Sequence, residues 1–123
     1  MIPKGLRLWF VVHFAVDILF AVPLLCAPAA LLTFLGWTTI DPLASRLVGA
    51  ALMAIGLESL LGRNGTAESF RTMLNLKIIW SLSAITGIAL SIAQGAPAVA
   101  WGFLAIFSMF SALWIIYRIR LRA

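Results

Sequence analysis

The sequence predicts an all-α integral membrane protein, an antiparallel bundle of four transmembrane helices, and three observations lead to this fold class. First, 63% of the 123 residues are hydrophobic and 11% are charged, whereas soluble proteins average about 45–50% and about 25%. Second, the apolar residues gather in four segments, each near the ~20 residues that a helix needs to cross a bilayer. Third, no polar–apolar alternation predicts membrane strands. Because a soluble domain this small leaves about 40% of its extended-chain surface exposed, we expect the lipid bilayer to be its solvent.

The predicted spans follow the hydrophobic segments in order, within a single membrane domain of residues 1–123. Pro23 and Pro28 interrupt the apolar stretch after the first span, and proline removes a backbone donor and clashes one turn back. We therefore expect the first helix to end near Cys26. A short interfacial helix should then cover about 28–36, with Gly36 at its end. The four spans cover about 8–26, 44–61, 70–93 and 98–117.

Basic residues flank these spans and give the expected orientation. Seven of the nine lie at the chain ends or in the charged loop near residues 62–71: Lys4, Arg7, Arg63, Arg71, Arg118, Arg120 and Arg122. The turn at residues 94–97 has no charge. By the positive-inside rule, both termini and the middle loop should face the cytoplasm. The same placement explains the net charge of +5 without a nucleic-acid partner.

Four ionisable residues lie well inside the predicted spans, away from their ends: His13, Asp17, Glu58 and Lys77. The first span contains twelve Leu, Ile, Phe or Val residues, worth roughly −5 kcal/mol in total at about −0.3 to −0.6 kcal/mol each. This sum outweighs the ~2.5–3.5 kcal/mol cost of a central aspartate. The helix can therefore insert, but the aspartate needs a physical reason to be there.

The side chains of these four residues can meet in the cytoplasmic half of the bundle, which predicts one intramembrane polar cluster. His13 and Asp17 are four residues apart and so share a helix face. Side chains lean toward the amino end of their helix, which allows Lys77 to lie between Asp17 and Glu58, with His13 and Asn75 completing the hydrogen bonds. Such residues mark proton or cation paths in some proteins and serve as buried structural clamps in others. The sequence leaves both interpretations open.

Other residues are assigned to packing and anchoring. Arg46, near the outer end of the second span, reads as an anchor that can pair with Asp41. Small residues in "GAALMAIG" (49–56) and at Ser81, Ala84, Gly87 and Ser91 predict close helix packing. Trp9, Trp37, Trp101 and Trp114 lie near span boundaries and are expected at the membrane interface, whereas Trp80 lies deeper and is expected to pack.

The sequence contains no motif of a familiar catalytic or cofactor site. A single histidine and a single cysteine do not supply the usual haem, zinc or iron–sulfur ligand sets within one chain. No phosphate-binding glycine motif or nucleophile elbow is present. We therefore expect no enzymatic activity, no metal and no cofactor.

The segment "FLGWTTIDPLASRLVGAALMAIGLESLLGR" joins a proline-ended first span to a glycine-rich second span. Over roughly residues 8–62 this pattern is similar to DoxX-like and related small bacterial four-span proteins. The resemblance implies a four-helix membrane protein of a prokaryotic inner or cell membrane. The resemblance assigns no functional role to any residue of this chain.

Two functions fit these observations. In the first, the protein is a non-enzymatic membrane subunit or assembly element, whose polar cluster sets helix packing and the choice of a homo-oligomeric or membrane-complex partner. In the second, it is a minimal oligomeric proton-coupled transporter or channel in which Asp17 or Glu58 exchanges a proton against a solute. The first is preferred because nothing in the sequence defines a substrate.

Overall fold

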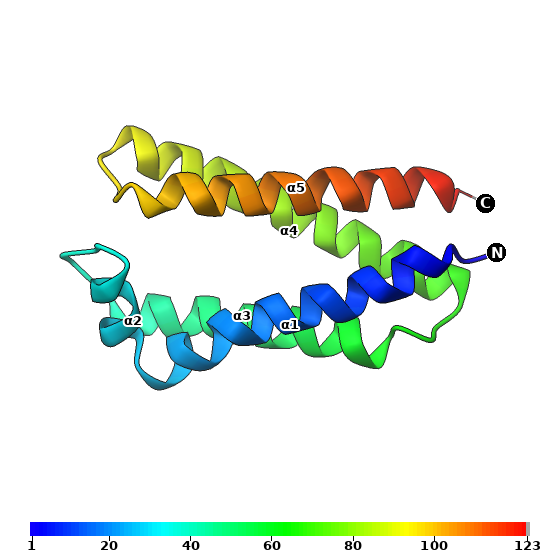
Figure 1. Cartoon of the computed structure of the whole chain (residues 1–123), viewed down its shortest axis with the longest axis horizontal. Coiled ribbons are helices and arrows are strands. Elements are labelled where there is room, and N and C mark those ends of the chain that lie inside the picture. Colours follow the sequence, from blue (N-terminus) through cyan, green and yellow to red (C-terminus); the bar gives the residue numbers. More distant parts are fainter. Residues whose placement is uncertain (123) are drawn as a thin grey trace. The chain divides into compact units, whose positions relative to one another are not determined.

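The computed structural model describes residues 1–122, and these residues form five α-helices and no strand. The helices are α1 (Lys4–Cys26), α2 (Pro28–Phe34), α3 (Pro42–Leu61), α4 (Ala67–Ala93) and α5 (Val99–Arg120), drawn in Figure 1. The chain divides into two compact units. The α1–α3 unit comprises Pro3–Gly65, and the α4–α5 unit comprises Met1, Ile2 and the chain from Thr66 onward.

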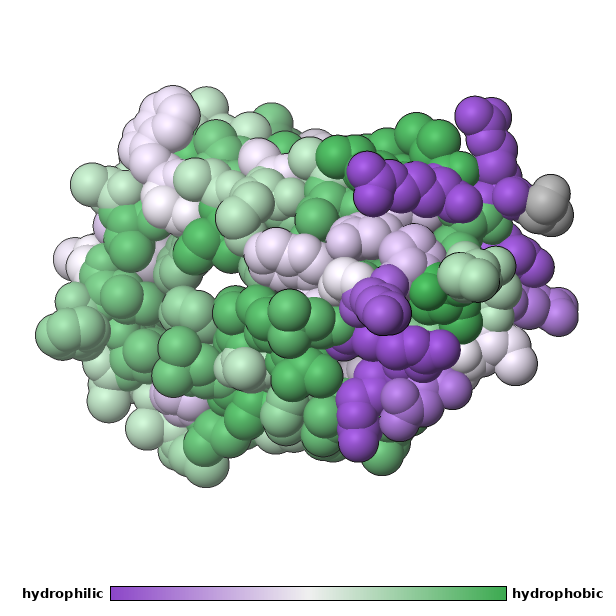
Figure 2. Space-filling model, turned by 45° about the vertical axis from the view of Figure 1, so that its right-hand side comes forward, coloured by the Kyte–Doolittle hydropathy of each residue, from purple (hydrophilic) through white to green (hydrophobic). Residues whose placement is uncertain are grey.

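The four longest helices, α1, α3, α4 and α5, are long and apolar enough to cross a membrane. At most 28% of the residues in the apolar window of any of them are buried. Large apolar side chains such as Leu19, Ile79 and Trp101 are more than 60% exposed, and hydrophobic residues cover much of the surface in Figure 2. Exposed apolar surface on this scale is typical of a partner or a membrane surface.

Within the α1–α3 unit, α1 and α3 lie side by side, with the start of α1 beside the end of α3 (Figure 1). Two hydrogen bonds join the paired ends. Arg7 Nη1 donates to the carbonyl oxygen of Arg63 at 2.6 Å, and Arg46 Nε donates to that of Leu25 at 3.1 Å. Each helix buries one stripe at spacings of three and four residues: Leu6, Phe10, His13, Asp17, Ala21 and Leu24 on α1, and Gly49, Leu52, Gly56 and Ser59 on α3.

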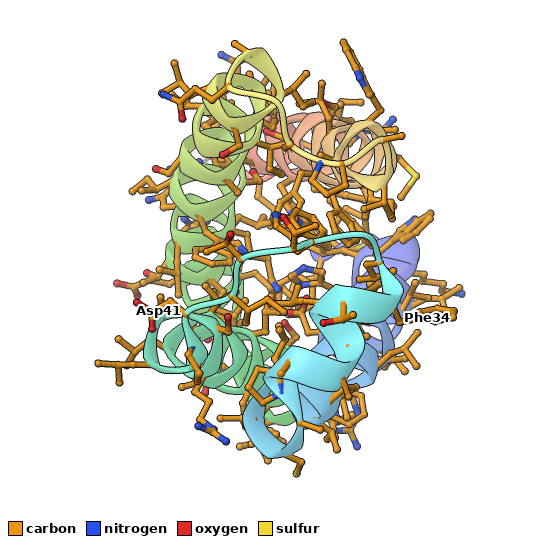
Figure 3. The ribbon with its side chains drawn as sticks, turned by 90° about the vertical axis from the view of Figure 1, so that its left-hand side faces the viewer. Phe34 and Asp41 are labelled. Carbon is orange, nitrogen blue, oxygen red and sulfur yellow. The ribbon has the colours of Figure 1, made fainter. Side chains whose placement is uncertain are left out.

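The region between α1 and α3 confirms the predicted helix break. The helix α1 ends at Cys26, three residues after Pro23, and Pro28 opens α2. The helix α2 ends at Phe34, and Gly36 follows with a φ of 108°, a conformation that glycine adopts without steric cost. Figure 3 shows Phe34 at the outer edge of α2 and Asp41 at the start of α3. Phe34 is 85% exposed, so this short helix presents an apolar side chain to its surroundings.

In the α4–α5 unit, α4 and α5 pack side by side and are joined by a tight turn in which Gly95 has a φ of 93°. Trp80 meets Phe107 edge to face, and Phe110 stacks on Trp114. The helix α4 begins three residues before the predicted span because the Thr66 side chain caps it, accepting a hydrogen bond from the Ser69 N–H at 3.2 Å. Trp114 is 1% exposed, so its predicted interfacial position is wrong and it belongs to the core of this unit.

Candidate functional site: a buried histidine–aspartate pair

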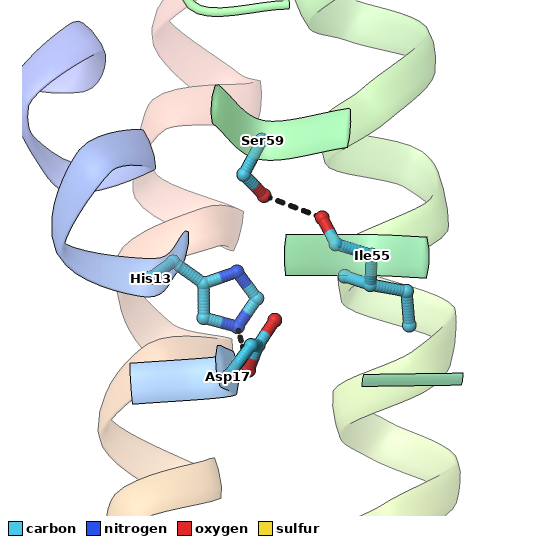
Figure 4. Close-up of polar contacts among 4 residues, drawn as sticks. All are labelled: His13, Asp17, Ile55 and Ser59. Carbon is cyan, nitrogen blue, oxygen red and sulfur yellow. Dashed lines mark hydrogen bonds and ion pairs between the residues drawn. The ribbon is translucent and has the colours of Figure 1, made fainter. Parts of the chain in front are cut away.

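The best-defined polar site in the α1–α3 unit is the pair formed by His13 and Asp17 on α1. Both residues are 5% exposed, and His13 Nε2 lies 3.4 Å from Asp17 Oδ1. Their spacing of four residues puts them on one helix face, and Figure 4 shows both side chains pointing from α1 toward α3. When the imidazole is protonated, this contact is an ion pair. The shared helix face that the sequence indicates for these two residues is where this contact forms.

On α3, the residue that packs against Asp17 is a glycine, Gly56. A Cβ atom added to Gly56 would lie 2.8 Å from Asp17 Cβ and 3.5 Å from Asp17 Oδ2. The first distance is shorter than real Cβ contacts, so only glycine fits without a shift of one helix. Gly49, two turns earlier, approaches α1 in a similar way, with Leu24 Cβ at 3.0 Å from its added Cβ. These two glycines confirm the predicted close packing of the "GAALMAIG" segment.

Ser59 is a buried polar residue that sequence reasoning missed. It is 1% exposed and lies on the same stripe of α3 as Gly56. Its Oγ donates to the carbonyl oxygen of Ile55 at 2.8 Å (Figure 4), the local bond that serine commonly makes inside a helix. The signal that could have found it is its spacing from Gly49, Leu52 and Gly56.

Glu58 is not part of this site, contrary to the sequence-based prediction. Its side chain is exposed and makes no hydrogen bond or ion pair with the described residues. The physical reason is helix rotation. At 100° per residue, position 58 points about 100° away from Ser59 and about 160° away from Gly56, the two neighbours that lie on the buried stripe.

Lys77 and Asn75 belong to the α4–α5 unit. Lys77 is 2% exposed, and its Nζ lies 5.0 Å from the centre of the Trp114 ring, within the range of a cation–π contact. Asn75, in contrast, is exposed, and its Oδ1 accepts a hydrogen bond from Arg118 Nε at 2.8 Å. Asn75 therefore holds Arg118, near the end of α5, by a hydrogen bond and does not contribute to a buried cluster.

Asp41 and Arg46 each have a structural partner of their own. The Asp41 carboxylate accepts hydrogen bonds from the N–H groups of Leu43 and Ala44 at 2.9 and 3.1 Å, which caps α3. Arg46 donates to Leu25 near the end of α1, where helix carbonyl groups lack partners within the helix. Arg46 and Asp41 therefore do not pair with each other as expected. Asp41 caps α3, and Arg46 ties the start of α3 to the end of α1.

Among the described residues, no group of three or more His, Cys, Asp or Glu side chains is placed to hold a metal ion. Comparisons with protein-family models, with curated proteins and with solved structures find no significant match to this chain. The resemblance to DoxX-like proteins therefore stays a prediction from the pattern of residues 8–62.

Proposed function

We propose that this chain is a small polytopic membrane protein that acts as a non-enzymatic subunit or assembly element. Its four long helices cross the bilayer as an antiparallel bundle with both termini in the cytoplasm. The apolar character of α1, α3, α4 and α5 supports this proposal, and so do their exposed leucine, isoleucine and tryptophan side chains. The basic residues near the chain ends and between α3 and α4 support the orientation.

The observation that carries the proposal is the fit of Asp17 against Gly56. A buried charged or polar pair is costly in an apolar interior, and its best-attested benefit is to select one register among several packings. Sliding α1 along α3 by one turn, about 5.4 Å, would move Asp17 away from the one position whose missing Cβ makes room for it. The pair thus acts as a clamp that holds α1 and α3 in one register.

Support for an assembly role comes from α4, where Ser83, Gly87 and Ser91 recur every four residues and are exposed. A Cβ added to Gly87 would meet nothing within 4 Å. Small residues at this spacing let another membrane helix approach closely. This surface differs from the predicted one, because Ser81 is buried and hydrogen-bonded to the Ile78 carbonyl oxygen.

The test is a stability cycle on the purified protein in detergent, with Asp17→Asn, His13→Gln and both changes together. The clamp predicts that each single change lowers the free energy of unfolding, with a coupling of about 0.6–1.7 kcal/mol between the two positions, the range of polar pairs in membrane proteins. A variant that unfolds like the wild type would contradict the clamp. Loss of the oligomer in Gly87→Leu, with the fold retained, is the outcome expected for an assembly surface.

A proton-coupled transporter or channel is the second candidate, and one observation favours it. His13 and Asp17 are two titratable groups in contact inside an apolar helix, an arrangement able to hand on a proton. In liposomes, proton flux that disappears in Asp17→Asn while thermal stability is unchanged would establish transport and overturn the clamp. Glu58, the alternative carboxylate for this mechanism, is exposed, so Asp17 is the candidate proton carrier.

A further inference from the structure

One end of the α4–α5 unit carries four arginines from two distant parts of the sequence. Arg71 lies near the start of α4, Arg118 and Arg120 lie in the last turn of α5, and Arg122 follows that helix. Glu68 is the single acidic residue in this part of the chain. The end of α5 is accordingly hydrophilic, at the right-hand side of Figure 2.

Two of the four arginines are held in place by hydrogen bonds. Arg118 Nε donates to Asn75 Oδ1 at 2.8 Å, and Arg71 Nη1 donates to the carbonyl oxygen of Leu121 at 3.2 Å. Each bond uses one of the five N–H donors of a guanidinium, and neither side chain makes a further hydrogen bond with the described residues. The unused donors of a guanidinium group suit the oxygen atoms of a phosphate group, and the two hydrogen bonds place Arg71 and Arg118 where the start of α4 meets the end of α5.

Apolar side chains continue from this polar end along both helices. Ile79 lies one turn beyond Asn75 on α4 and is 65% exposed, and Ile115 lies one turn before Arg118 on α5 and is 37% exposed. Leu76 on α4 is also half exposed. The surface thus passes within about one helical turn, ~5.4 Å, from cationic donors to exposed hydrocarbon, which is the amphipathic pattern of a phospholipid.

We propose that Arg71 and Arg118 bind the phosphate of an anionic phospholipid, whose acyl chains lie along Leu76, Ile79 and Ile115. This inference rests on the proposed membrane location but not on the proposed assembly role. Arg120 lies over the Tyr117 ring, with its Cζ 5.8 Å from the ring centre, and neither Arg120 nor Arg122 makes a side-chain hydrogen bond with the described residues. They therefore attract the anionic membrane surface through their charge alone, which falls off with distance and salt.

The experiment measures binding of phosphatidylglycerol and phosphatidylcholine to the full chain in detergent micelles by native mass spectrometry. Two double variants remove the same charge from the same end of the unit: Arg71→Gln with Arg118→Gln, and the matched control Arg120→Gln with Arg122→Gln. The first should weaken phosphatidylglycerol binding about tenfold or more, because charge-assisted hydrogen bonds are lost. The control should weaken it less than about threefold, because only screened attraction is lost.

Equal losses in the two double variants would overturn the site in favour of diffuse attraction. Equal binding of the two lipids by the wild type would overturn it as well. A further arm adds inorganic phosphate, and full displacement of the lipid by millimolar phosphate would show a free-anion site instead. If the glutamine variant does not fold, Arg71→Lys with Arg118→Lys keeps the charge and removes the planar fork, and unchanged lipid binding in that variant would overturn the proposal.

Two further outcomes distinguish a failure of the lipid site from a failure of the proposed membrane location. A chain that fractionates with membranes but shows no preference for the anionic lipid refutes the lipid site alone. A chain recovered in the soluble fraction after expression refutes both.

Discussion

At the scale of single residues, the contact between Asp17 and Gly56 has the least room for change. A methyl group at position 56 would overlap Asp17 Cβ at 2.8 Å, and the backbone of α1 lies directly behind it. The neighbour is a Cβ atom and not the mobile end of a long side chain. Relief therefore requires that α1 move away from α3, which also separates Asp17 from its buried surroundings.

We expect Gly56→Ala to lower the free energy of unfolding by about 1–3 kcal/mol, the usual cost of overpacking. Gly102→Ala in α5 is the matched control, because its added Cβ meets nothing within 4 Å and alanine favours a helix by about 1 kcal/mol over glycine. The measurement is unfolding of both variants in one detergent. Equal stability of the two would show that the close approach of α1 and α3 is not maintained in solution.

The positions of Asp17 and Glu58 predict that neutralising the first lowers the free energy of unfolding and that neutralising the second hardly changes it. Glu58→Gln alters an exposed group with no partner among the described residues, so its unfolding free energy should stay within about 0.5 kcal/mol of the wild type. Asp17→Asn changes a buried group in contact with His13 and should cost about 1–3 kcal/mol. Thermal unfolding of the two variants side by side makes the comparison. A larger loss of stability in Glu58→Gln than in Asp17→Asn would show that Glu58 is part of a buried cluster.

At the scale of helices, the ends of α3 show how side chains fix the boundaries of an element. Asp41 satisfies two N–H groups at its start. Arg46, one turn further on, reaches across to the Leu25 carbonyl near the end of α1. The same short segment therefore begins one helix and ties it to another. The first turn of α3 is held in place by polar bonds where apolar packing is thin.

We expect Asp41→Ala to lower stability by about 1 kcal/mol, since it leaves two N–H groups at the start of α3 without their acceptor. Asp41→Asn keeps an oxygen acceptor and should recover most of the loss. Hydrogen exchange of the Leu43 and Ala44 amides is the direct measurement, with faster exchange expected in the alanine variant alone. Equal exchange in both variants would mean that the cap does not hold the helix start.

At the scale of the whole molecule, the distribution of arginine and lysine sets the expected topology. Basic residues are concentrated in the first turn of α1, around the connection from α3 to α4 and at the end of α5, whereas the turn between α4 and α5 has none. Moving a charged segment across a membrane is unfavourable, so the basic segments should remain on the cytoplasmic side.

Fusions of a periplasmic-active phosphatase in a bacterial host test this topology. Fusions after Gly65 and after Arg122 should be inactive, because we expect both sites in the cytoplasm, and fusions after Thr39 and after Gly95 should be active. A cytoplasmic-active fluorescent reporter at the same four sites is the control and should give the reverse pattern. Activity of the phosphatase after Gly65 would contradict the four-span arrangement.

The helical class, the number of long apolar helices, the break at Pro23–Pro28 and the shared helix face of His13 and Asp17 all follow from the sequence alone. These properties depend on local signals: hydrophobic length, proline and glycine positions, and the four-residue spacing on one helix. The burial of Ser59 and Trp114, the exposure of Glu58 and the hydrogen bond between Asn75 and Arg118 emerge only once the helices are packed. Each of those outcomes depends on how a helix is rotated about its axis, and in α3 that rotation follows from the one close approach that Gly49 and Gly56 allow. Hydrophobic segments that are apolar on nearly every side carry too weak an amphipathic signal to fix rotation in advance.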